Sequence, residues 1–566
     1  MYILANMTRD YRLILFLLLA TVILPAAIYA AGLNVPATSP VYDFLRRLET
    51  QGTIRGLNDL ALPLTRDEIV AFLRQAEQND ARLSRVEKKI LREYLADYCY
   101  ETERQVSGAD SIAVPLFQKG YFGKAFPQLF SRQDAVEENH FLMYEKGETF
   151  FWFDVGARGR MDWKGNHQKQ MFSDKYMFRG ALGKSFTFHT SFARFAVRHN
   201  PAFTEPYDEE RGMWSMFQAD STITFDNIQS SLVYHNANFD LGLYRQPVSW
   251  GAGGTNNLIL SKSAPLFSYI GFNTQYRGIK LTFMHGSLMN DSTQYRNIPT
   301  ETRNRPKYLA AHRIDIPFFK GSTIIGFSEM VIYGDRNMEV SYLMPFGFYW
   351  PAGHALEDRD NLLMSMDFKT TFLRNVTFYG SVLIDEMRFG ELGKHWWANK
   401  HALQAGTRLS PTLAFFPVDI QLEFTAVRPW TYSHKTLSTD YTQNGICLGF
   451  PYDANAQAWY LKVGAAFSRR FSVSGDYLHL RQGTDDENNY WGGDPTVSYE
   501  LRNPNYDHST KWLMGDIKTA DQVKIIGSYE LFNDFFLKSG ATFYSTELNG
   551  QHESHRFGYI EMEVNF

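Results

Sequence analysis

The chain has 566 residues, a formal net charge of −4 and a mean hydropathy of −0.33, values that by themselves suit a large soluble protein of several domains. The aromatic content argues against a soluble protein, and the lack of a basic cluster argues against a nucleic-acid-binding one. Aromatic residues make up 16% of the chain, including 45 Phe and 32 Tyr, and no basic cluster stands out. The two cysteines exclude a disulfide framework and a cysteine-ligated metal; they leave open whether Cys99 and Cys447 form one bridge or remain two thiols.

The first 31 residues have the composition of a secretory signal peptide. Arg9 and Arg12 precede an apolar stretch at 13–24, and the small-residue sequence PAAIYAAG follows it. The apolar stretch is about a dozen residues long, shorter than the ~20 that a membrane-spanning helix needs. We therefore expect residues 1–31 to be a cleaved signal peptide and the mature protein to be exported.

Residues 39–104 show the hydrophobic period of helices and predict a small three-helix bundle. Ser39-Pro40 begins the first predicted helix, with proline in the first turn. The second and third begin at capping boxes, TRDE at 65–68 and SRVE at 84–87. A bundle of about 65 residues buries only a small core, so we expect it to dock on the rest of the chain. Residues 105–147 are the predicted linker.

From residue 148 to residue 566 the hydrophobic period changes to two, as in β-strands. In the stretch TFFWFDVGARGRMDW, Met161 and Trp163 lie on one face and Asp154 and Asp162 on the other. Further segments of about ten residues show the same contrast, with aromatic residues at their ends. The last segment, FGYIEMEVNF, ends at Phe566 and is similar to the C-terminal signal of outer-membrane barrels. These segments indicate a transmembrane β-barrel, since a soluble β-sandwich needs no aromatic residues at its strand ends.

Short turns between the alternating segments predict the number of strands. Eight such turns give nine hairpins and so about 18 antiparallel strands. Longer polar connections alternate with the turns; in bacterial barrels these face outward, while both barrel termini face the periplasm. The predicted turns lie at Gly183-Lys184, Asp226-Asn227, Arg277-Gly278, Lys320-Gly321, Arg374-Asn375, Pro417-Val418, Arg469-Arg470 and Asn533-Asp534.

Three stretches that follow the predicted bundle resemble a known family. They are LGLYRQPVSWGAGGTNNLILSKSAPLF at 241–267, GHALEDRDNLLMSMDF at 353–368 and VRPWTYSH at 427–434. In this order they resemble the Wzi-type family of capsule-assembly outer-membrane proteins, over nearly all of the mature chain. The resemblance implies a barrel of about 18 strands with the bundle at its periplasmic mouth, in the outer membrane of a Gram-negative bacterium. It also implies a surface lectin, not an enzyme, that holds capsular polysaccharide.

The expected partners follow from the resemblance, from the predicted barrel with its C-terminal signal, and from the motifs that the sequence lacks. They are capsular or other surface polysaccharide, outer-membrane lipid and the barrel-insertion machinery during biogenesis, for a monomer with no nucleic acid, metal or cofactor. A diffusion channel is an alternative, since Asp154, Arg158 and Arg160 would face a wide lumen. An enzyme that modifies lipid or glycan is another, but no residues that flank His285 and Ser287 support an activated nucleophile.

Aromatic and planar polar residues in the long loops are the candidates for carbohydrate binding. An aromatic ring stacks on the C–H face of a sugar, while carboxylate, amide and guanidinium groups bind its hydroxyls. Structural alternatives exist, because Tyr and Trp at loop bases form an interfacial girdle and Arg359 with Asp360 suits an ion pair. The candidates are Trp350, His354, Asp358, Arg359, Asp360, Asn361, Trp396, Trp397, Trp430, Tyr432 and Trp491.

The glycine-rich part of the first stretch needs its own interpretation. A phosphate cradle would place its glycines between a strand and the N-terminus of a helix, but no helical period follows here. We therefore expect a loop at the outer rim of one hairpin, where glycine lets the backbone fold tightly and leaves open a fold inward over the lumen. The residues of this rim loop are Arg245, Trp250, Gly251, Gly253 and Gly254.

Overall fold

The computed structural model describes residues 32–103, 111–113, 140–199, 215–219, 222–236, 238–253, 256–290, 305–413, 416–532 and 534–565. The predicted signal peptide at 1–31 lies outside these residues, and so does most of the predicted linker at 105–147. In the described part, none of the helices combines the length and the apolar character of a membrane-crossing helix.

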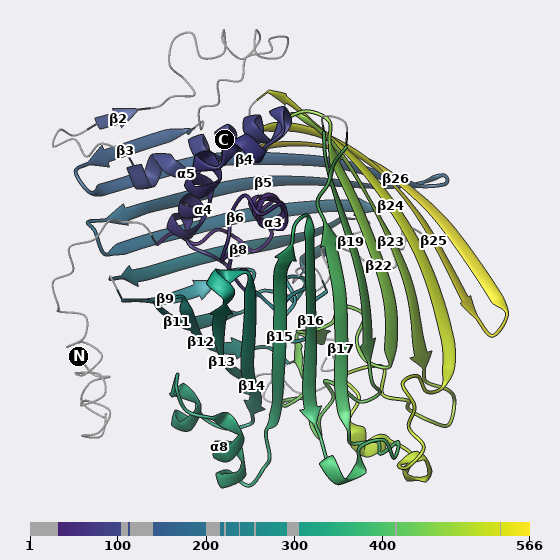
Figure 1. Cartoon of the computed structure of the whole chain (residues 1–566). Helices are drawn as coiled ribbons and strands as arrows, with labels where there is room; N and C mark the ends of the chain where they lie inside the picture. The colour runs from purple at the N-terminus through teal and green to yellow at the C-terminus, as the bar shows by residue number, and fades with distance from the viewer. Residues whose placement is uncertain are drawn as a thin grey trace.

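Eighteen antiparallel strands form a closed β-barrel, which confirms the predicted fold class (Figure 1). Each strand pairs with the next along the chain, and β26 pairs with β4 to close the barrel. Short connections lie at one end of the barrel, the turn end; most connections at the other, the loop end, are long. The barrel strands are β4 (Thr149–Lys164), β5 (His167–Leu182), β6 (Phe186–His199), β8 (Thr222–His235), β9 (Phe239–Arg245), β11 (Ser268–Tyr276), β12 (Ile279–Leu288), β13 (Lys307–Phe318), β14 (Thr323–Gly334), β15 (Asn361–Leu373), β16 (Val376–Glu386), β17 (Lys400–Leu409), β19 (Phe416–Val427), β22 (Ala456–Ala466), β23 (Phe471–Thr484), β24 (Asp516–Phe532), β25 (Phe535–Leu548) and β26 (Gln551–Asn565).

Side chains alternate between the lumen and the outer surface as the sequence predicts. On β4, Met161 and Trp163 are exposed on the outer surface, while Asp154 is buried on the lumen side. Arg158, on the same inner face, donates to Glu561 Oε2 at 2.8 Å across the β4–β26 seam. Apolar residues outside and paired charges inside are the pattern of a barrel wall that faces lipid.

Two of the predicted turns are wrong. Asp226-Asn227 has the composition of a turn, but it lies inside β8 and pairs there with β6. Asp226 Oδ1 lies 3.8 Å from Arg194 Nε of β6. The chain reverses instead between the end of β8 at His235 and the start of β9 at Phe239. Pro417-Val418 lies at the start of β19, where it already pairs with the short β18 (Thr412–Leu413). The strand number is unaffected because each turn moves only within its own hairpin.

Three helices form a small bundle at the turn end, opposite α8 in Figure 1. They are α3 (Val41–Thr50), α4 (Arg66–Gln78) and α5 (Arg85–Glu103). Both predicted capping boxes are present: Glu68 N donates to Thr65 Oγ1 at 3.3 Å, and Glu87 N donates to Ser84 Oγ at 3.2 Å. The helices share one small buried core, so further contacts with the barrel are needed to stabilise them.

Several short strands and helices are additional to the eighteen strands of the wall. β10 pairs with β1, which follows α3, and β20 pairs with β21. Cys447, the last residue of β21, is buried, and the side chain of Cys99 is outside the described ones. The short elements are β1 (Ala61–Leu62), β2 (Ser111–Ala113), β3 (Leu142–Lys146), β7 (Ser215–Ala219), β10 (Ser249–Trp250), β20 (Thr442–Gln443), β21 (Ile446–Cys447), α8 (Tyr349–Ala355), η1 (Asp80–Arg82), η3 (Phe319–Gly321), η4 (Val340–Leu343), η5 (Phe389–Glu391), η6 (Tyr499–Leu501) and η7 (Pro504–Tyr506).

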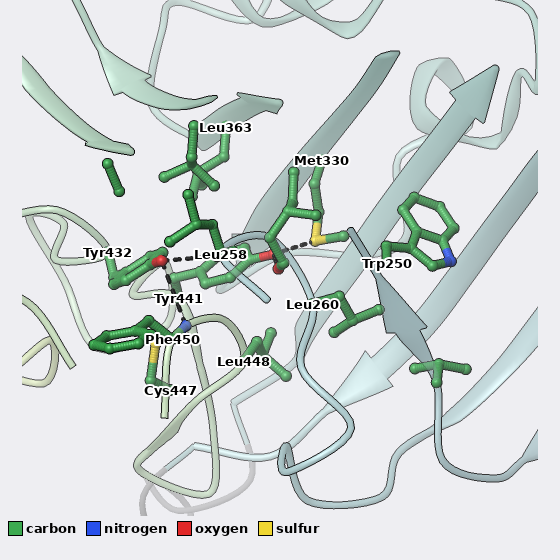
Figure 2. Packing of buried hydrophobic residues seen from close by; sticks show 14 of the residues in the cluster. Trp250, Leu258, Leu260, Met330, Leu363, Tyr432, Tyr441, Cys447, Leu448 and Phe450 are labelled. Carbon is green, nitrogen blue, oxygen red and sulfur yellow. Dashed lines mark hydrogen bonds between the residues drawn. The ribbon is translucent and has the colours of Figure 1, made fainter. Parts of the chain in front are cut away.

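Segments of the chain occupy the lumen. Two loops from the loop end, 246–267 and 428–455, run into the barrel and pack against each other (Figure 2). Tyr441 of one loop donates a hydrogen bond to Ile259 O of the other. The core that they form includes residues of the wall strands from β8 to β25, so it lies inside the barrel. Its wall residues include Val233, Leu309, Leu383, Leu478 and Ala520.

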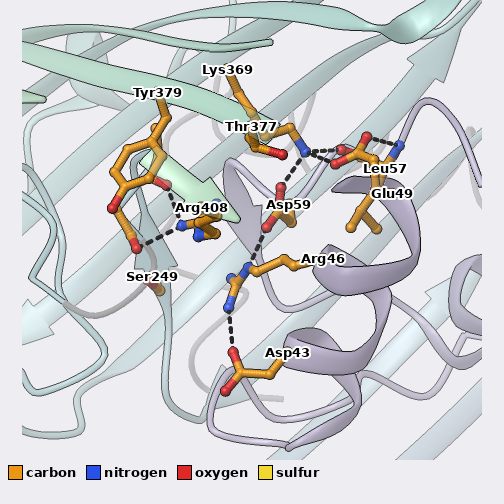
Figure 3. A network of polar contacts seen from close by, with 12 residues as sticks. Asp43, Arg46, Glu49, Leu57, Asp59, Ser249, Lys369, Thr377, Tyr379 and Arg408 are labelled. Atoms are coloured by element: carbon orange, nitrogen blue, oxygen red, sulfur yellow. Dashed lines mark hydrogen bonds and ion pairs between the residues drawn. The ribbon is translucent and has the colours of Figure 1, made fainter. Parts of the chain in front are cut away.

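A buried ion network joins the bundle to the inner wall (Figure 3). Lys369 Nζ of β15 lies 2.8 Å from Glu49 Oε2 of α3 and 2.6 Å from Asp59 Oδ1. Asp59 also accepts from Arg46 Nε at 2.6 Å, and all four side chains are buried. Burial alone would raise the pKa of Asp59, but Lys369 and Arg46 outweigh it and hold that pKa well below its usual range. Because a buried charge needs partners, the network holds the bundle against the wall.

Replacing Lys369 with Met removes the shared cation and leaves Glu49 buried without it. We expect the free energy of unfolding in detergent to fall by about 3–5 kcal/mol, the cost of breaking a buried pair. The matched control is Lys462→Met, because Lys462 pairs at 3.1 Å with the exposed Asp43, where a loss of about 0–1 kcal/mol is expected. Denaturant unfolding of both variants measures the difference, and equal losses would contradict the role given to the network.

Candidate functional site

Most of the predicted rim loop lies inside the lumen, which corrects its expected position at the rim. Trp250 is buried, and Gly251 N donates to Leu60 O at 2.8 Å, so the loop meets the region that follows α3. The carbonyl of Gly253 accepts from Arg408 Nη2 at 2.7 Å on the wall. Gly251 has a φ of 128°, a conformation that L side chains rarely adopt. The loop therefore occupies part of the lumen.

The other two residues of the predicted rim loop are placed differently. Arg245 ends β9 and its Nε donates to Ile228 O of β8 at 3.2 Å, so it is part of the wall. Gly254 lies outside the described residues. β9 and β11 are short, so the wall extends less far toward the loop end at these two strands. The loop enters the lumen there.

The predicted carbohydrate-binding residues divide into two groups from different loops. In the first group, Asp360 accepts from both terminal nitrogens of Arg336, at 2.7 and 2.6 Å, and from Tyr342 Oη at 2.8 Å. Asp360 thus forms a structural ion pair, although with Arg336 and not with its neighbour Arg359. The first group, from the loop at 335–360 and the first residue of β15, comprises Trp350, His354, Asp358, Arg359, Asp360 and Asn361.

The tryptophans of the second group gather at the loop end, where the loops at 387–399, 428–455 and 485–515 converge. Trp397 and Trp430 are buried, and both share one apolar cluster onto which Trp396 packs. The Trp396 and Trp397 ring centroids are 6.1 Å apart. Trp491 is half-buried beside them and lines a shallow cleft with Trp397 and Trp430. We call this set the tryptophan cluster: Trp396, Trp397, Trp430 and Trp491.

The cleft also contains residues that were missed in the sequence. Arg502 lies over the Trp397 ring at 3.8 Å and pairs with Asp507 at 3.0 Å. Tyr506 packs 4.8 Å from the Trp491 ring and is itself 40% exposed, so its ring is open to solvent. The stretch NPNYDHSTKW has the same mixture of aromatic and planar polar residues as the loops that were selected. That signal would have found them.

Hydrogen bonds of the Asn455 side chain to the backbone and close packing at Gly492 maintain the shape of the cleft. The side chain of Asn455 donates to Trp491 O at 3.1 Å and to Met514 O at 3.0 Å, and it accepts from Met514 N at 2.9 Å. Gly492 has a φ of 70° and lies directly on the Trp430 ring, where a Cβ would come within 2.5 Å of a ring atom. Only glycine allows this close approach of the 485–515 loop to Trp430.

Two acidic residues orient Trp491. Its backbone N–H donates to Asp485 Oδ1 at 2.6 Å, and its indole Nε1 donates to Asp486 Oδ2 at 2.8 Å. The backbone N–H of Asn488 and the indole of Trp491 both donate to Asp486 and lower the pKa of its carboxyl group. The acidic residues therefore fix the indole plane, which leaves one edge of the cleft preformed.

Tyr432 belongs to the lumen core beneath the cleft. It is fully buried, its hydroxyl donates to Leu258 O at 2.7 Å, and its ring centroid lies 5.5 Å from that of Tyr441. Its backbone N–H donates to Asp385 Oδ2 at 2.7 Å on β16. Tyr432 therefore supports the loops that carry the tryptophan cluster and does not line the cleft itself.

A solved outer-membrane barrel shares this fold. Wzi of Escherichia coli, an outer-membrane protein involved in group 1 capsule assembly and a carbohydrate-binding β-barrel, aligns with a TM-score of 0.58 and 14% identity, over 94% of this chain and 100% of Wzi. OprD of Pseudomonas aeruginosa aligns with a TM-score of 0.42 and 8% identity, over 74% of this chain and 95% of OprD. No protein-family model and no curated sequence matches the chain. The likeness to Wzi establishes a common fold.

Replacing Gly492 with Ala tests whether close packing on Trp430 shapes the cleft. The matched control is Gly393→Ala, because Gly393 has a similar φ of 76° but no atom near the position of the added Cβ. Each variant loses about 1–2 kcal/mol to backbone strain. We expect Gly492→Ala to lose about 1–3 kcal/mol more through the clash and to change tryptophan fluorescence. Thermal unfolding compares them, and identical behaviour of the two variants would contradict the packing described.

Proposed function

We propose that this chain is an outer-membrane protein of a Gram-negative bacterium that binds capsular or other surface polysaccharide and helps to hold it on the cell. The tryptophan cluster and its cleft carry the proposal, because they combine aromatic rings with a paired guanidinium and carboxylate. The fold shared with Wzi, a carbohydrate-binding barrel, supports it. So does the resemblance of three sequence stretches to the Wzi-type family.

The proposed orientation places the loop end outside the cell and the bundle in the periplasm. Bacterial barrels have short turns on the periplasmic side and long loops outside. The eight short turns and the bundle lie at one end here, and the tryptophan cluster lies at the other. This orientation presents the cleft to surface polysaccharide.

The cleft suits weak contacts with each repeat unit of a polymer. Trp491 and Tyr506 offer ring faces to the C–H side of a sugar, and Arg502, Asn503 and Asp507 offer planar groups to its hydroxyls. A shallow cleft gives modest affinity for one unit. Many repeats on one chain and many copies of the protein on one cell then supply retention through multivalency.

Binding of purified protein to an array of capsular polysaccharides tests the proposal. We expect at least one acidic or neutral capsular polymer to be retained, and retention to fall in Trp491→Ala/Tyr506→Ala. Each lost stacking contact weakens binding by about 0.5–1.5 kcal/mol, up to about tenfold in affinity. The control is Tyr276→Ala, since Tyr276 is an exposed aromatic residue at the turn end, the end opposite the cleft. Failure to retain any polymer, or equal retention by both variants, would refute the proposal.

A diffusion channel is the alternative, because a barrel of this size is wide enough to conduct when empty. The packed loops at 246–267 and 428–455 occupy part of that space, and the bundle is tied to the inner wall through Lys369. We therefore expect no steady open channels from the unaltered protein in planar bilayers. Replacement of residues 249–263 with a short Gly-Ser linker is the positive control for an opened lumen. Large open conductance of the unaltered protein would favour the channel.

A further inference from the structure

The loop at 335–360 folds back over the outer surface of the barrel. It connects β14 and β15, and its helix α8 packs on both strands. Tyr342 and Tyr349 of the loop are fully buried against Val331 and Tyr333 of β14. The loop therefore covers part of the wall, whereas the loops of the tryptophan cluster lie over the barrel mouth.

Strand alternation shows that the covered surface is the outward one. Met330 and Ile332 of β14 belong to the lumen core, so Val331 and Tyr333 point outward. Phe327 lies on the same outward face nearer the turn end and is 46% exposed. On the outward face of β14, the half nearer the loop end is thus covered by the loop, and the half nearer the turn end is exposed.

The covered wall carries polar groups that the loop satisfies. Glu329 Oε2 lies 3.0 Å from His312 Nε2 on the outward face and also accepts from Tyr349 N of the loop at 2.9 Å. His285 Nε2 and Tyr333 Oη lie 2.7 Å apart. Polar groups without partners cost several kcal/mol in hydrocarbon. A wall with these residues on its outward face needs such a cover wherever it passes through a membrane.

The covered residues lie at membrane depth if β14 spans the bilayer. β14 is 12 residues long, and a tilted membrane strand needs about 9–11 residues to cross the hydrocarbon. Glu329, Val331 and Tyr333 lie in the half of β14 nearer the loop end. The wall cannot place its bare half in hydrocarbon without also placing some of this covered half there.

The outer surface of the loop is apolar. Between residues 338 and 356, Glu339 is the sole acidic residue and no Lys or Arg occurs, whereas charged residues gather at both ends of the loop, at 335–336 and 357–360. Phe346 and Phe348 are each 75% exposed, an unusual degree for Phe. The exposed apolar side chains are Met338, Val340, Met344, Phe346, Phe348 and Trp350.

We propose that the 335–360 loop is inserted in the outer leaflet of the membrane, with its exposed apolar side chains in contact with lipid. The inference rests on the part of the proposed function that places the barrel in a membrane, and it is independent of polysaccharide binding. The apolar surface continues the lipid-facing wall of β13 to β15, where Ile314, Phe327 and Met366 are exposed. The charged ends lie at the rim, where Arg336 and Asp360 clamp the base of the loop. Trp350 then lies at the interface, where tryptophan is favoured.

Spin labels on the full-length protein in lipid vesicles test the proposal. Phe348→Cys carries the label in a background of Cys99→Ser and Cys447→Ala. Ile525→Cys on the bare wall of β24 is the lipid reference, and Glu487→Cys in the 485–515 loop is the water reference; both native residues are exposed. Collisions with oxygen report lipid, and collisions with a water-soluble nickel chelate report water.

We expect the label at 348 to lose most of its collisions with the nickel chelate relative to the label at 487, and to match the label at 525. A label at 348 that behaves like the one at 487, while 525 reports lipid, overturns the proposal and leaves the barrel in the membrane. A label at 525 that reports water refutes the membrane placement itself. The measurement is repeated at one protein per nanodisc, and protection at 348 that disappears there would indicate a second copy of the chain and also overturn the proposal.

Discussion

The packing of the chain inside the lumen is the constraint on which the rest of the structure depends. A barrel of 18 strands encloses a space that its own wall side chains cannot fill. The chain packs into it from both ends, with α3 and the β1 region from the turn end and the loops at 246–267 and 428–455 from the loop end. Lys369 on the wall requires Glu49 and Asp59, so the bundle and the barrel position each other.

The candidate site is built on that filling. Tyr432 anchors the 428–455 loop to Leu258 within the lumen, and two residues before it Trp430 comes to the surface of the core. The 485–515 loop then rests on Trp430 through Gly492, and the 387–399 loop rests on the 485–515 loop, where Trp397 N donates to Asp507 O at 2.8 Å. A cleft on this support is preformed, which lowers the entropy that a bound sugar must offset.

Local features of the sequence predicted the scaffold well. The helix starts at Thr65 and Ser84 follow from capping boxes, and the wall follows from strict alternation, because both depend on neighbours along the chain. The loops depend on distant partners. Nothing local distinguishes Tyr432, which is buried in the core, from Trp491, which lines the cleft. The Asp226-Asn227 turn failed for the same reason, since pairing with β6 overrides local turn chemistry.

The proposed function is that the cleft at the outer end of the barrel holds polysaccharide at the cell surface. Its most direct test is the partition of polysaccharide between cells and medium in the host bacterium. Cells that lack the gene are complemented with the unaltered chain or with Trp491→Ala/Tyr506→Ala, and surface expression of both is matched. We expect the total polysaccharide to stay constant while the variant, like the deletion, releases it into the medium. Cell-attached polysaccharide that is unchanged by the deletion would contradict the proposed function.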